Sequence, residues 1–337
     1  MSNNLTKKNI LITGGAGFIG SNLCEYFLKK ENRIVCLDNL STGKKENIET
    51  LLSDDLFTLI EGDIRDYNTC LKACNNVDYI FHEAALGSVP RSIKDPISTT
   101  DVNISGFVKM LYAAKEKGIK RFVYAASSST YGDHTALPKV EDTIGKPLSP
   151  YAITKYVNEL YAENFSKLYG LETIGLRYFN VFGRRQDPYG TYAAVIPLFV
   201  KQLMNHQSPR INGDGEYSRD FTYIDNVIFA NECAAVTTKA DIFSITHPKD
   251  TYLAEVFNIA FGERTTLNNL FQYLKDNLSK FDSKIGSITP LYGETREGDI
   301  PHSLASIKKA QELLGYYPKF SVKEGLEEAC EWYWNNL

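Results

Sequence analysis

The sequence has no excess of basic residues, no long apolar run and no dense set of cysteines. Lys and Arg number 37 against 41 Asp and Glu, and the resulting formal charge of −4 excludes bulk attraction to nucleic acid or to an anionic membrane. No run approaches the roughly 18 apolar residues of a membrane span, and the first residues lack a signal peptide's apolar stretch. We therefore expect a cytoplasmic protein that binds neither nucleic acid nor membrane.

The six cysteines are too scattered for a disulfide scaffold. Cys70 and Cys74 lie one helical turn apart, yet none of the five histidines stands beside them at ligand spacing. We interpret the cysteines as free thiols and predict no metal site. Internal repeats, low-complexity tracts and long linkers are also missing from the sequence.

The 337 residues suffice for about two domains. In the first half, short β-branched runs alternate with longer amphipathic stretches, which is typical of βαβ units. The apolar runs lie at 9–13, 34–37, 57–60, 79–82, 122–126, 173–179 and 257–261. Continuous apolar strands belong in a parallel sheet that helices cover on both faces. The predicted fold class is α/β, with a doubly wound parallel (Rossmann) sheet.

Past residue 180 the alternation weakens, and loops rich in Gly, Pro, Arg and Tyr appear. We predict a Rossmann domain over 1–180, to which the chain returns around 222–262, and a smaller α/β substrate domain over 181–337. Closing helices are expected near 266–278, 303–314 and 322–335. The two parts should share an extended interface, and the cleft between them is the expected ligand site.

A glycine-rich loop, residues 13–20, follows the first predicted strand and opens a helix. Gly14, Gly17 and Gly20 stand at the spacing of a dinucleotide fingerprint. Such positions let the backbone approach a pyrophosphate and aim helix N–H groups at it. Asp38 ends the second predicted strand, where a carboxylate accepts ribose hydroxyls and repels a 2′-phosphate. The combination favours NAD over NADP, and the alternative is a plain tight turn with a solvated aspartate.

A candidate catalytic group follows further along the chain. Ser127 stands at the end of a predicted strand, and Tyr151 and Lys155 lie on one face of a helix that begins after Pro150. A free tyrosine has a pKa of ~10, and a nearby ammonium favours its phenolate. Lys155 supplies that charge. The alternative is a solvent-facing Tyr and Lys pair on an amphipathic helix.

Together these motifs resemble the extended short-chain dehydrogenase/reductase family and, within it, the sugar-nucleotide epimerases. The resemblance runs from about residue 9 to residue 333. Besides the motifs above, it rests on segments 38–43, 62–64, 82–85, 127–132, 177–180 (Arg-Tyr-Phe-Asn), 212–215, 218–221 and 296–299 (Arg-Glu-Gly-Asp). Segments 87–92 and 180–186 are similar to those of bacterial UDP-N-acetylglucosamine 4-epimerases, which make UDP-N-acetylgalactosamine for surface polysaccharide.

The resemblance implies NAD as cofactor and a set of contacts to it. Phe18 and Ile19 would give backbone N–H groups to the pyrophosphate. The adenosine ribose would meet Asp38, Asn39, Ser41, Thr42 and Gly43, and the adenine would meet Asp63 and Ile64. The rest of the dinucleotide would meet Ala84, Ala85, Asn103 and Lys155. For Asp63 the alternative is a simple turn after a strand.

The resemblance also implies a UDP-sugar substrate. Arg219 and Arg296 would clamp its pyrophosphate, where guanidinium forks suit paired phosphate oxygens, and Asn180 would donate to the same group. The uridine would be bordered by Ala194, Val195 and Asn212. The hexose would be surrounded by Gly87, Ser88, Ser127, Ser128, Ser129, Gln186 and Ser303. For Ser88, Ser129, Gln186 and Ser303, the alternative is that they are ordinary polar residues of surface loops.

The implied activity is NAD-dependent 4-epimerisation of UDP-N-acetylglucosamine through a 4-keto sugar. The Tyr151 phenolate would remove the 4-hydroxyl proton while Ser127 orients that oxygen. A 4,6-dehydratase would carry an Asp-Glu pair where Ser128 and Ser129 stand. Open alternatives are an epimerase of UDP-glucose/galactose or of a UDP-hexuronic acid, a net oxidoreductase, and a non-catalytic NAD-binding module.

Ser303 bears on the choice of sugar. Epimerases restricted to non-acetylated sugars carry a tyrosine at this place, and its ring fills the space that a 2-acetamido group needs. The small serine leaves that space open and offers a hydroxyl. The alternative is that Ser303 caps a helix starting near residue 304.

The family commonly forms homodimers through two helices of each subunit. One candidate is 102–117, with Phe107, Met110, Leu111 and Ala114 at helical spacing, and the other contains Leu160, Asn164, Phe165 and Leu168. Both stripes equally suit packing on the subunit's own sheet.

Overall fold

The computed structural model describes residues 5–190, 193–246, 251–295 and 300–337. Within those residues a seven-stranded sheet has the order β11-β6-β5-β4-β1-β2-β3, and all its neighbouring strands are parallel. The strands are β1 (Asn9–Thr13), β2 (Arg33–Asp38), β3 (Phe57–Glu61), β4 (Tyr79–His82), β5 (Arg121–Ser127), β6 (Glu172–Tyr178) and β11 (Ala254–Ile259). The predicted doubly wound parallel sheet is confirmed.

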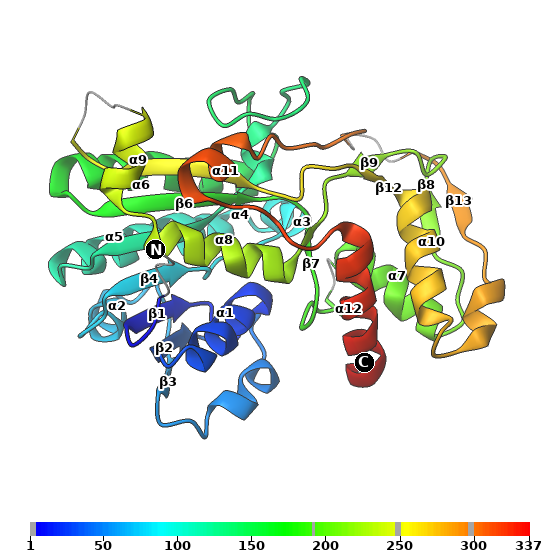
Figure 1. The fold of residues 1–337 in the computed structure, drawn as a ribbon, viewed down its shortest axis with the longest axis horizontal. Helices are drawn as coiled ribbons and strands as arrows, with labels where there is room; N and C mark the ends of the chain where they lie inside the picture. Colours follow the sequence, from blue (N-terminus) through cyan, green and yellow to red (C-terminus); the bar gives the residue numbers. More distant parts are fainter. Residues whose placement is uncertain (1–4, 191–192, 247–250, 296–299) are drawn as a thin grey trace.

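Helices cover both faces of this sheet (Figure 1). One face carries α1 (Phe18–Lys29) and α8 (Ile224–Val236), and the other carries α2 (Tyr67–Ala73), α5 (Phe107–Glu116) and α6 (Pro150–Tyr169). Side chains alternate along a strand, so Ile10 and Ile12 enter the first core while Leu11 enters the second. Because both faces of the sheet are buried, the strands have continuous apolar sequences.

Shorter elements connect these helices and strands. They are α3 (Val89–Lys94), α4 (Pro96–Thr100), a π-helical segment Asp101–Gly106, α9 (Lys239–Thr246), α11 (Lys308–Leu314) and the 3-10 turns Lys45–Asn47, Glu49–Leu51, Ser128–Tyr131 and Ser283–Ser287.

After β6 the chain enters a smaller part, which lies to the right in Figure 1. It contains α7 (Val195–Met204), α10 (Leu267–Leu278) and α12 (Val322–Asn336). Its short strands are β7 (Val181–Phe182), β8 (Arg210–Asn212), β9 (Ser218–Arg219), β10 (Thr222–Tyr223), β12 (Thr265–Thr266) and β13 (Leu291–Gly293). The strands pair as β10–β7, β12–β9 and β13–β8. One apolar core runs from the sheet face under α8 into α7, α10 and α12.

The chain crosses between the two parts more than once. It returns to the sheet through α8 and through β11, which forms the edge strand beside β6. Helix α11 also lies against this edge, where Lys309 pairs with Glu255 at 2.8 Å. Just after α11, the Tyr316 hydroxyl donates to the Ala260 carbonyl at 2.9 Å. The segment around α11 therefore contacts the edge of the large sheet although it follows the elements of the smaller part.

Two predicted element bounds are wrong, and one predicted helix differs in type over its first turns. The last sheet strand is shifted toward the N-terminus from 257–261, because its register with β6 pairs Ala254 with Thr173. The helix expected over 303–314 begins only at Lys308. Residues before it are extended, since Ser303 N–H donates to the Ser218 carbonyl at 3.0 Å. The helix expected from residue 102 begins as a π-helical segment.

All six cysteines are buried and free. In the described ranges, His, Cys, Asp and Glu side chains form no cluster that could hold a metal ion. None of the helices described is both long and apolar enough to cross a bilayer.

Candidate active site

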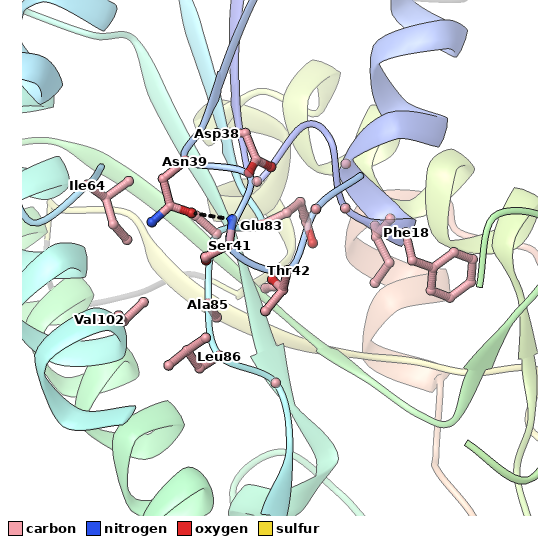
Figure 2. A pocket seen from close by; sticks show the side chains of 18 of the residues that line it. Phe18, Asp38, Asn39, Ser41, Thr42, Ile64, Glu83, Ala85, Leu86 and Val102 are labelled. Carbon is pink, nitrogen blue, oxygen red and sulfur yellow. Dashed lines mark hydrogen bonds between the residues drawn. The ribbon is translucent and has the colours of Figure 1, made fainter. Parts of the chain in front are cut away.

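A cavity of about 680 Å³ opens at the carboxyl ends of the sheet strands. Strand β1 pairs with β2 on one side and β4 on the other, so the connections diverge at β1. This is the switch point at which doubly wound sheets bind ligands. Figure 2 shows side chains from the loops after β2, β3 and β4 and from the start of α1 converging on the cavity.

The loop between β1 and α1 needs its glycines. Gly14 has a φ of +68°, and a Cβ there would lie 2.7 Å from the Ala84 nitrogen. A Cβ on Gly20 would lie 2.1 Å from the Gly14 carbonyl oxygen. Gly17 is the N-cap of α1 and has no side chain to satisfy the first-turn N–H groups. These groups line the cavity, and they form a cradle for an anion.

Asp38 is fixed at the end of β2 and is only 8% exposed. Its Oδ2 accepts from the Ala16 N–H at 2.9 Å, and its Oδ1 accepts from the Leu40 N–H at 2.8 Å. Carboxylate oxygens have further lone pairs, so Asp38 can also accept from two hydroxyl groups. Ser41 and Thr42 follow on the same loop, where Ser41 N–H donates to Asn39 Oδ1 at 3.1 Å (Figure 2).

Asp63 lies at the mouth of the cavity and is already engaged. Arg65 lies 2.8 Å from Asp63 Oδ2 and lowers the pKa of that carboxyl group to about 2. Asn39 Nδ2 donates to the same oxygen at 2.7 Å. Asp63 is therefore a stable anion that holds the loops after β2 and β3 together.

Helix α6 carries two of the candidate catalytic residues. Ser149 caps it by accepting from the Ala152 N–H at 3.1 Å, and Pro150 occupies its first turn. Tyr151 and Lys155 then project from one helix face into the cavity, which Ser127 enters from the end of β5. The side chain of Ser127 interacts with the Tyr151 phenol. The three predicted catalytic side chains thus share one wall.

Burial shifts the proton affinities of this group. It lowers the pKa of Lys155 to about 8, and the Lys155 ammonium donates to the Ala125 carbonyl at 2.7 Å. Burial also raises the pKa of Tyr151, although the bond with Ser127 opposes that shift. The sequence predicted a Tyr151 pKa lowered by Lys155. That prediction is wrong for this cavity, because desolvation of the phenolate outweighs the other effects.

Most predicted site residues line this cavity. They are Gly14, Gly17, Phe18, Ile19, Gly20, Asp38, Asn39, Ser41, Thr42, Gly43, Asp63, Ile64, Ala84, Ala85, Gly87, Ser127, Tyr151, Lys155, Asn180 and Gln186. Asn180 Nδ2 donates to the Asp220 carbonyl at 3.0 Å, and Gln186 Nε2 donates to the Val181 carbonyl at 3.0 Å.

Other predicted residues lie outside the cavity lining. They are Ser88, Asn103, Ser128, Ser129, Ala194, Val195, Asn212, Arg219 and Ser303, and Arg296 falls outside the described residues. Asn103 is buried, and its Oδ1 accepts from the Leu86 N–H at 2.8 Å. It therefore supports the loop after β4, which lines the cavity, without lining the cavity itself. Ser88 caps α3. Arg219 donates to the Pro301 carbonyl at 3.1 Å.

The alternative reading of Ser303 as a helix cap is wrong. Helix α11 begins at Lys308, and Ile307 is its N-cap. The Ser303 N–H instead donates to Ser218, next to Arg219, at 3.0 Å. Ser303 is therefore held beside the strand that carries Arg219.

Sequence reasoning missed several residues of the cavity wall. Among them are Leu86 and Val102, which Figure 2 shows near Ala85, and the polar pair Glu83 and Tyr178. Glu83 follows β4 directly and Tyr178 ends β6. The rule that ligands meet the carboxyl ends of parallel strands was the signal that could have found both.

These features fit a dinucleotide. The glycine loop leaves no room for a Cβ, the start of α1 offers free N–H groups, and Asp38 offers acceptors to a ribose. The fold and site thus define an α/β protein that binds NAD. Residues 10–246 match the NAD dependent epimerase/dehydratase family, and the chain belongs to this family, whose cofactor is NAD.

Solved structures of this family cover nearly the whole chain. One is a UDP-N-acetylglucosamine 4-epimerase from Methanobrevibacter ruminantium, solved in complex with UDP-N-acetylmuramic acid. Its sequence is 37% identical to this chain, its TM-score is 0.88, and the match covers 99% of this chain and 100% of that chain. A UDP-glucose 4-epimerase from Thermotoga maritima, with UDP-glucose, is 36% identical with a TM-score of 0.84, over 97% and 99%. A UDP-glucuronic acid 4-epimerase from Bacillus cereus, with its substrate and NAD, is 30% identical with a TM-score of 0.83, over 97% and 99%.

Proposed function

We propose that this protein is a UDP-sugar 4-epimerase that interconverts UDP-N-acetylglucosamine and UDP-N-acetylgalactosamine. The observation that carries the proposal is the convergence of Ser127, Tyr151 and Lys155 on the cavity that the glycine loop and Asp38 also line. When bound, NAD supplies a hydride acceptor with a positive charge, which favours a phenolate nearby.

The chain's own residues then handle the proton. In the proposal Tyr151 takes the proton of the sugar 4-hydroxyl and later returns it, while Ser127 bridges the phenol and that oxygen. The Lys155 ammonium donates one of its three N–H groups to the Ala125 carbonyl, so two more can donate to ribose hydroxyls. Because the hydride that leaves C4 would return to C4, and the same phenol removes and restores the proton, the sugar undergoes no net oxidation.

The UDP group is placed by residues of the smaller part. We propose that Asn180 and Gln186, on the cavity wall, and Arg219 with Arg296 contact its phosphates. The uridine is assigned to Ala194, Val195 and Asn212, at the start of α7 and the end of β8. The hexose is assigned to Gly87, Ser88, Ser128, Ser129 and Ser303.

The acetylated sugar is favoured by Ser303 and by the similarity to a UDP-N-acetylglucosamine 4-epimerase. The relatives that act on UDP-glucose and UDP-glucuronic acid keep those sugars as the second candidates. A dehydratase is disfavoured, because Ser128 and Ser129 cannot supply the acid and base that elimination of water requires.

The experiment is a panel of UDP-N-acetylglucosamine, UDP-glucose and UDP-glucuronic acid, each incubated with the purified protein without added cofactor. Separation of the products should show the highest kcat/KM for the acetylated sugar. A higher value for either other sugar would reassign the substrate. The same panel distinguishes a net oxidoreductase, which would stop after one equivalent of NADH.

We also propose a homodimer. The α5 side chains predicted for the interface, Phe107, Met110, Leu111 and Ala114, are buried in the subunit's own core, as is Phe165 of α6. Two other predicted side chains, Leu160 and Leu168, are exposed on the outer face of α6 together with Ile153, at spacings of one helix face, and Leu168 is 62% exposed. A second copy of this chain is the proposed occupant. The activity is assigned to the cytoplasm, with the product used for surface polysaccharide.

A further inference from the structure

Glu83 is a carboxylate in the cavity wall, and the proton transfer proposed above does not involve it. It follows β4 directly, and its backbone N–H donates to the Thr13 carbonyl at 3.1 Å. The next N–H, of Ala84, donates to Thr13 Oγ1 at 3.3 Å. Figure 2 shows the Glu83 side chain among the residues that surround the cavity, which Tyr151 and Lys155 also line. The backbone contacts fix where this carboxylate can lie.

A directed chain of hydrogen bonds ends on Glu83. Asn231 Nδ2, fully buried on α8, donates to the Tyr178 hydroxyl oxygen at 2.9 Å. The Tyr178 hydroxyl then donates to Glu83 Oε1 at 3.0 Å. Because the amide nitrogen of Asn231 can only donate, the phenol hydrogen is directed at Glu83. Among the described residues, Glu83 Oε2 accepts no hydrogen bond, so it keeps its lone pairs for the cavity.

We propose that Glu83 is the counter-charge of the active site: held by Tyr178, it keeps Lys155 protonated, opposes ionisation of Tyr151 and thereby sets the pH range of catalysis. The proposal rests on the proposed function, because it assumes the roles given there to Tyr151 and Lys155. Glu83 is a positioning residue in this account, since it acts through the two side chains of α6.

The electrostatics of the cavity agree with this role. Burial raises the pKa of Glu83 to about 7, and the Tyr178 bond and the Lys155 charge both oppose that shift. Burial lowers the pKa of Lys155 to about 8, and Glu83 is the first group that opposes this shift. Glu83 also adds to the raised pKa of Tyr151. The charge of Glu83 therefore favours the ammonium form of Lys155 and the neutral form of Tyr151.

Neighbouring groups do not supply the same effect. Burial lowers the pKa of His82, on β4, to about 3, so it stays neutral in the working range. Burial raises the pKa of Tyr178, on β6, well above its usual value. Glu159 of α6 also supports the Lys155 charge, but it is paired with Arg177 of β6 at 2.8 Å. Of the two described carboxylates that act on Lys155, Glu83 is therefore the one that is not in an ion pair.

The sign of the effect follows directly. Above pH 7, where Glu83 is ionised, replacing it by Gln removes a negative charge, so Lys155 loses its proton at lower pH and Tyr151 ionises at lower pH. The acid limb of the pH profile of kcat, which reports Tyr151, and the alkaline limb, which reports Lys155, should therefore both move to lower pH. We expect the alkaline limb, which reports Lys155, to fall by about one pH unit.

The test compares Glu83→Gln, Tyr178→Phe and Glu255→Gln with the wild-type enzyme. Glu83→Gln should move both limbs to lower pH. Tyr178→Phe removes the bond that lowers the pKa of Glu83, so Glu83 should gain its charge at higher pH. The double variant should match Glu83→Gln alone. Glu255→Gln, at the far edge strand, should leave the profile unchanged.

A second readout does not need turnover. Ultraviolet difference titration of tyrosinate, with Tyr151→Phe as the reference, reports ionisation of Tyr151 in the purified protein. Its midpoint should fall in Glu83→Gln. Unchanged midpoints in both measurements would overturn the proposal. If the protein turns over no UDP-sugar but the tyrosinate midpoint still falls, the role of Glu83 stands and the proposed function fails.

Discussion

Single residues of this protein carry proton affinities that the fold sets by burial. Desolvation favours the neutral forms of Tyr151 and Lys155. The bond with Ser127 opposes this effect on the pKa of Tyr151, and the charge of Glu83 opposes it on the pKa of Lys155. In the free cavity at neutral pH, Lys155 keeps its proton because its pKa is still about 8, and Tyr151 stays a neutral phenol. A cation bound beside the phenol is what then permits proton removal.

Tyr151→Phe should abolish epimerisation. The change removes the only hydroxyl that the proposal uses as acid and base, so kcat should fall on the order of 10²- to 10⁴-fold. Kinetics with UDP-N-acetylglucosamine measure the loss, and circular dichroism with NAD content shows that the protein is folded and loaded. A variant with near wild-type kcat would contradict the assignment.

Ser303→Tyr should exclude the acetylated sugar and spare UDP-glucose. Overfilling a packed site costs about 1–3 kcal/mol, which is roughly 5- to 150-fold in kcat/KM. Ser303→Ala is the matched control and should keep both activities, because it adds no bulk. An unchanged kcat/KM for UDP-N-acetylglucosamine in Ser303→Tyr would show that another wall sets the selectivity.

At the level of elements, the site depends on a loop whose backbone leaves no space for side chains. The β1–α1 loop packs on the start of the loop after β4, because Gly14 lies against Ala84. Gly20 lies against Gly14 in turn. The phosphate cradle and the loop after β4 are therefore parts of one packed unit.

Gly20→Ala should disrupt this unit. The added Cβ would meet the Gly14 carbonyl oxygen at 2.1 Å, so the loop must move and the NAD site must distort. We expect a destabilisation of about 1–3 kcal/mol in urea unfolding and loss of NAD from the purified protein. Gly286→Ala is the control, since its Cβ would meet nothing closer than 3.7 Å. Retention of NAD by Gly20→Ala at the wild-type level would contradict this reading.

The sequence predicted the elements that follow local rules. Alternating apolar runs located the sheet, Pro150 located the start of α6, and the glycine spacing located the cradle. Local rules did not place α11, because Ser303 bonds Ser218 across a long stretch of chain. Nor did they find the link between Glu83 and Tyr178, which joins β4 to β6 through tertiary packing.

The whole molecule combines a continuous core with an exposed apolar face on α6. One apolar core extends through both parts, while Leu160 and Leu168 are exposed on the surface. Such a patch is typical of an interaction site. It lies on the sheet side of the molecule, away from α7, α10 and α12 (Figure 1).

Leu160→Glu with Leu168→Glu should convert the dimer to monomers. Burying two carboxylates in an apolar interface carries a large desolvation penalty, whereas both positions tolerate charge in the free subunit. Sedimentation velocity at micromolar concentration should show half the wild-type mass. Leu291→Glu, an exposed leucine on β13, is the control and should stay dimeric. A wild-type protein that sediments as a monomer would refute the dimer.

The most direct test of the central claim follows the hydrogen at C4. UDP-N-acetylglucosamine deuterated at C4 is incubated with the purified protein in ordinary water, with no added cofactor, and the product is analysed by mass spectrometry and NMR. We predict UDP-N-acetylgalactosamine that retains its deuterium at C4, because the hydrogen leaves and returns within one closed site. Product that has lost the deuterium to solvent, or the absence of any product, would contradict the account.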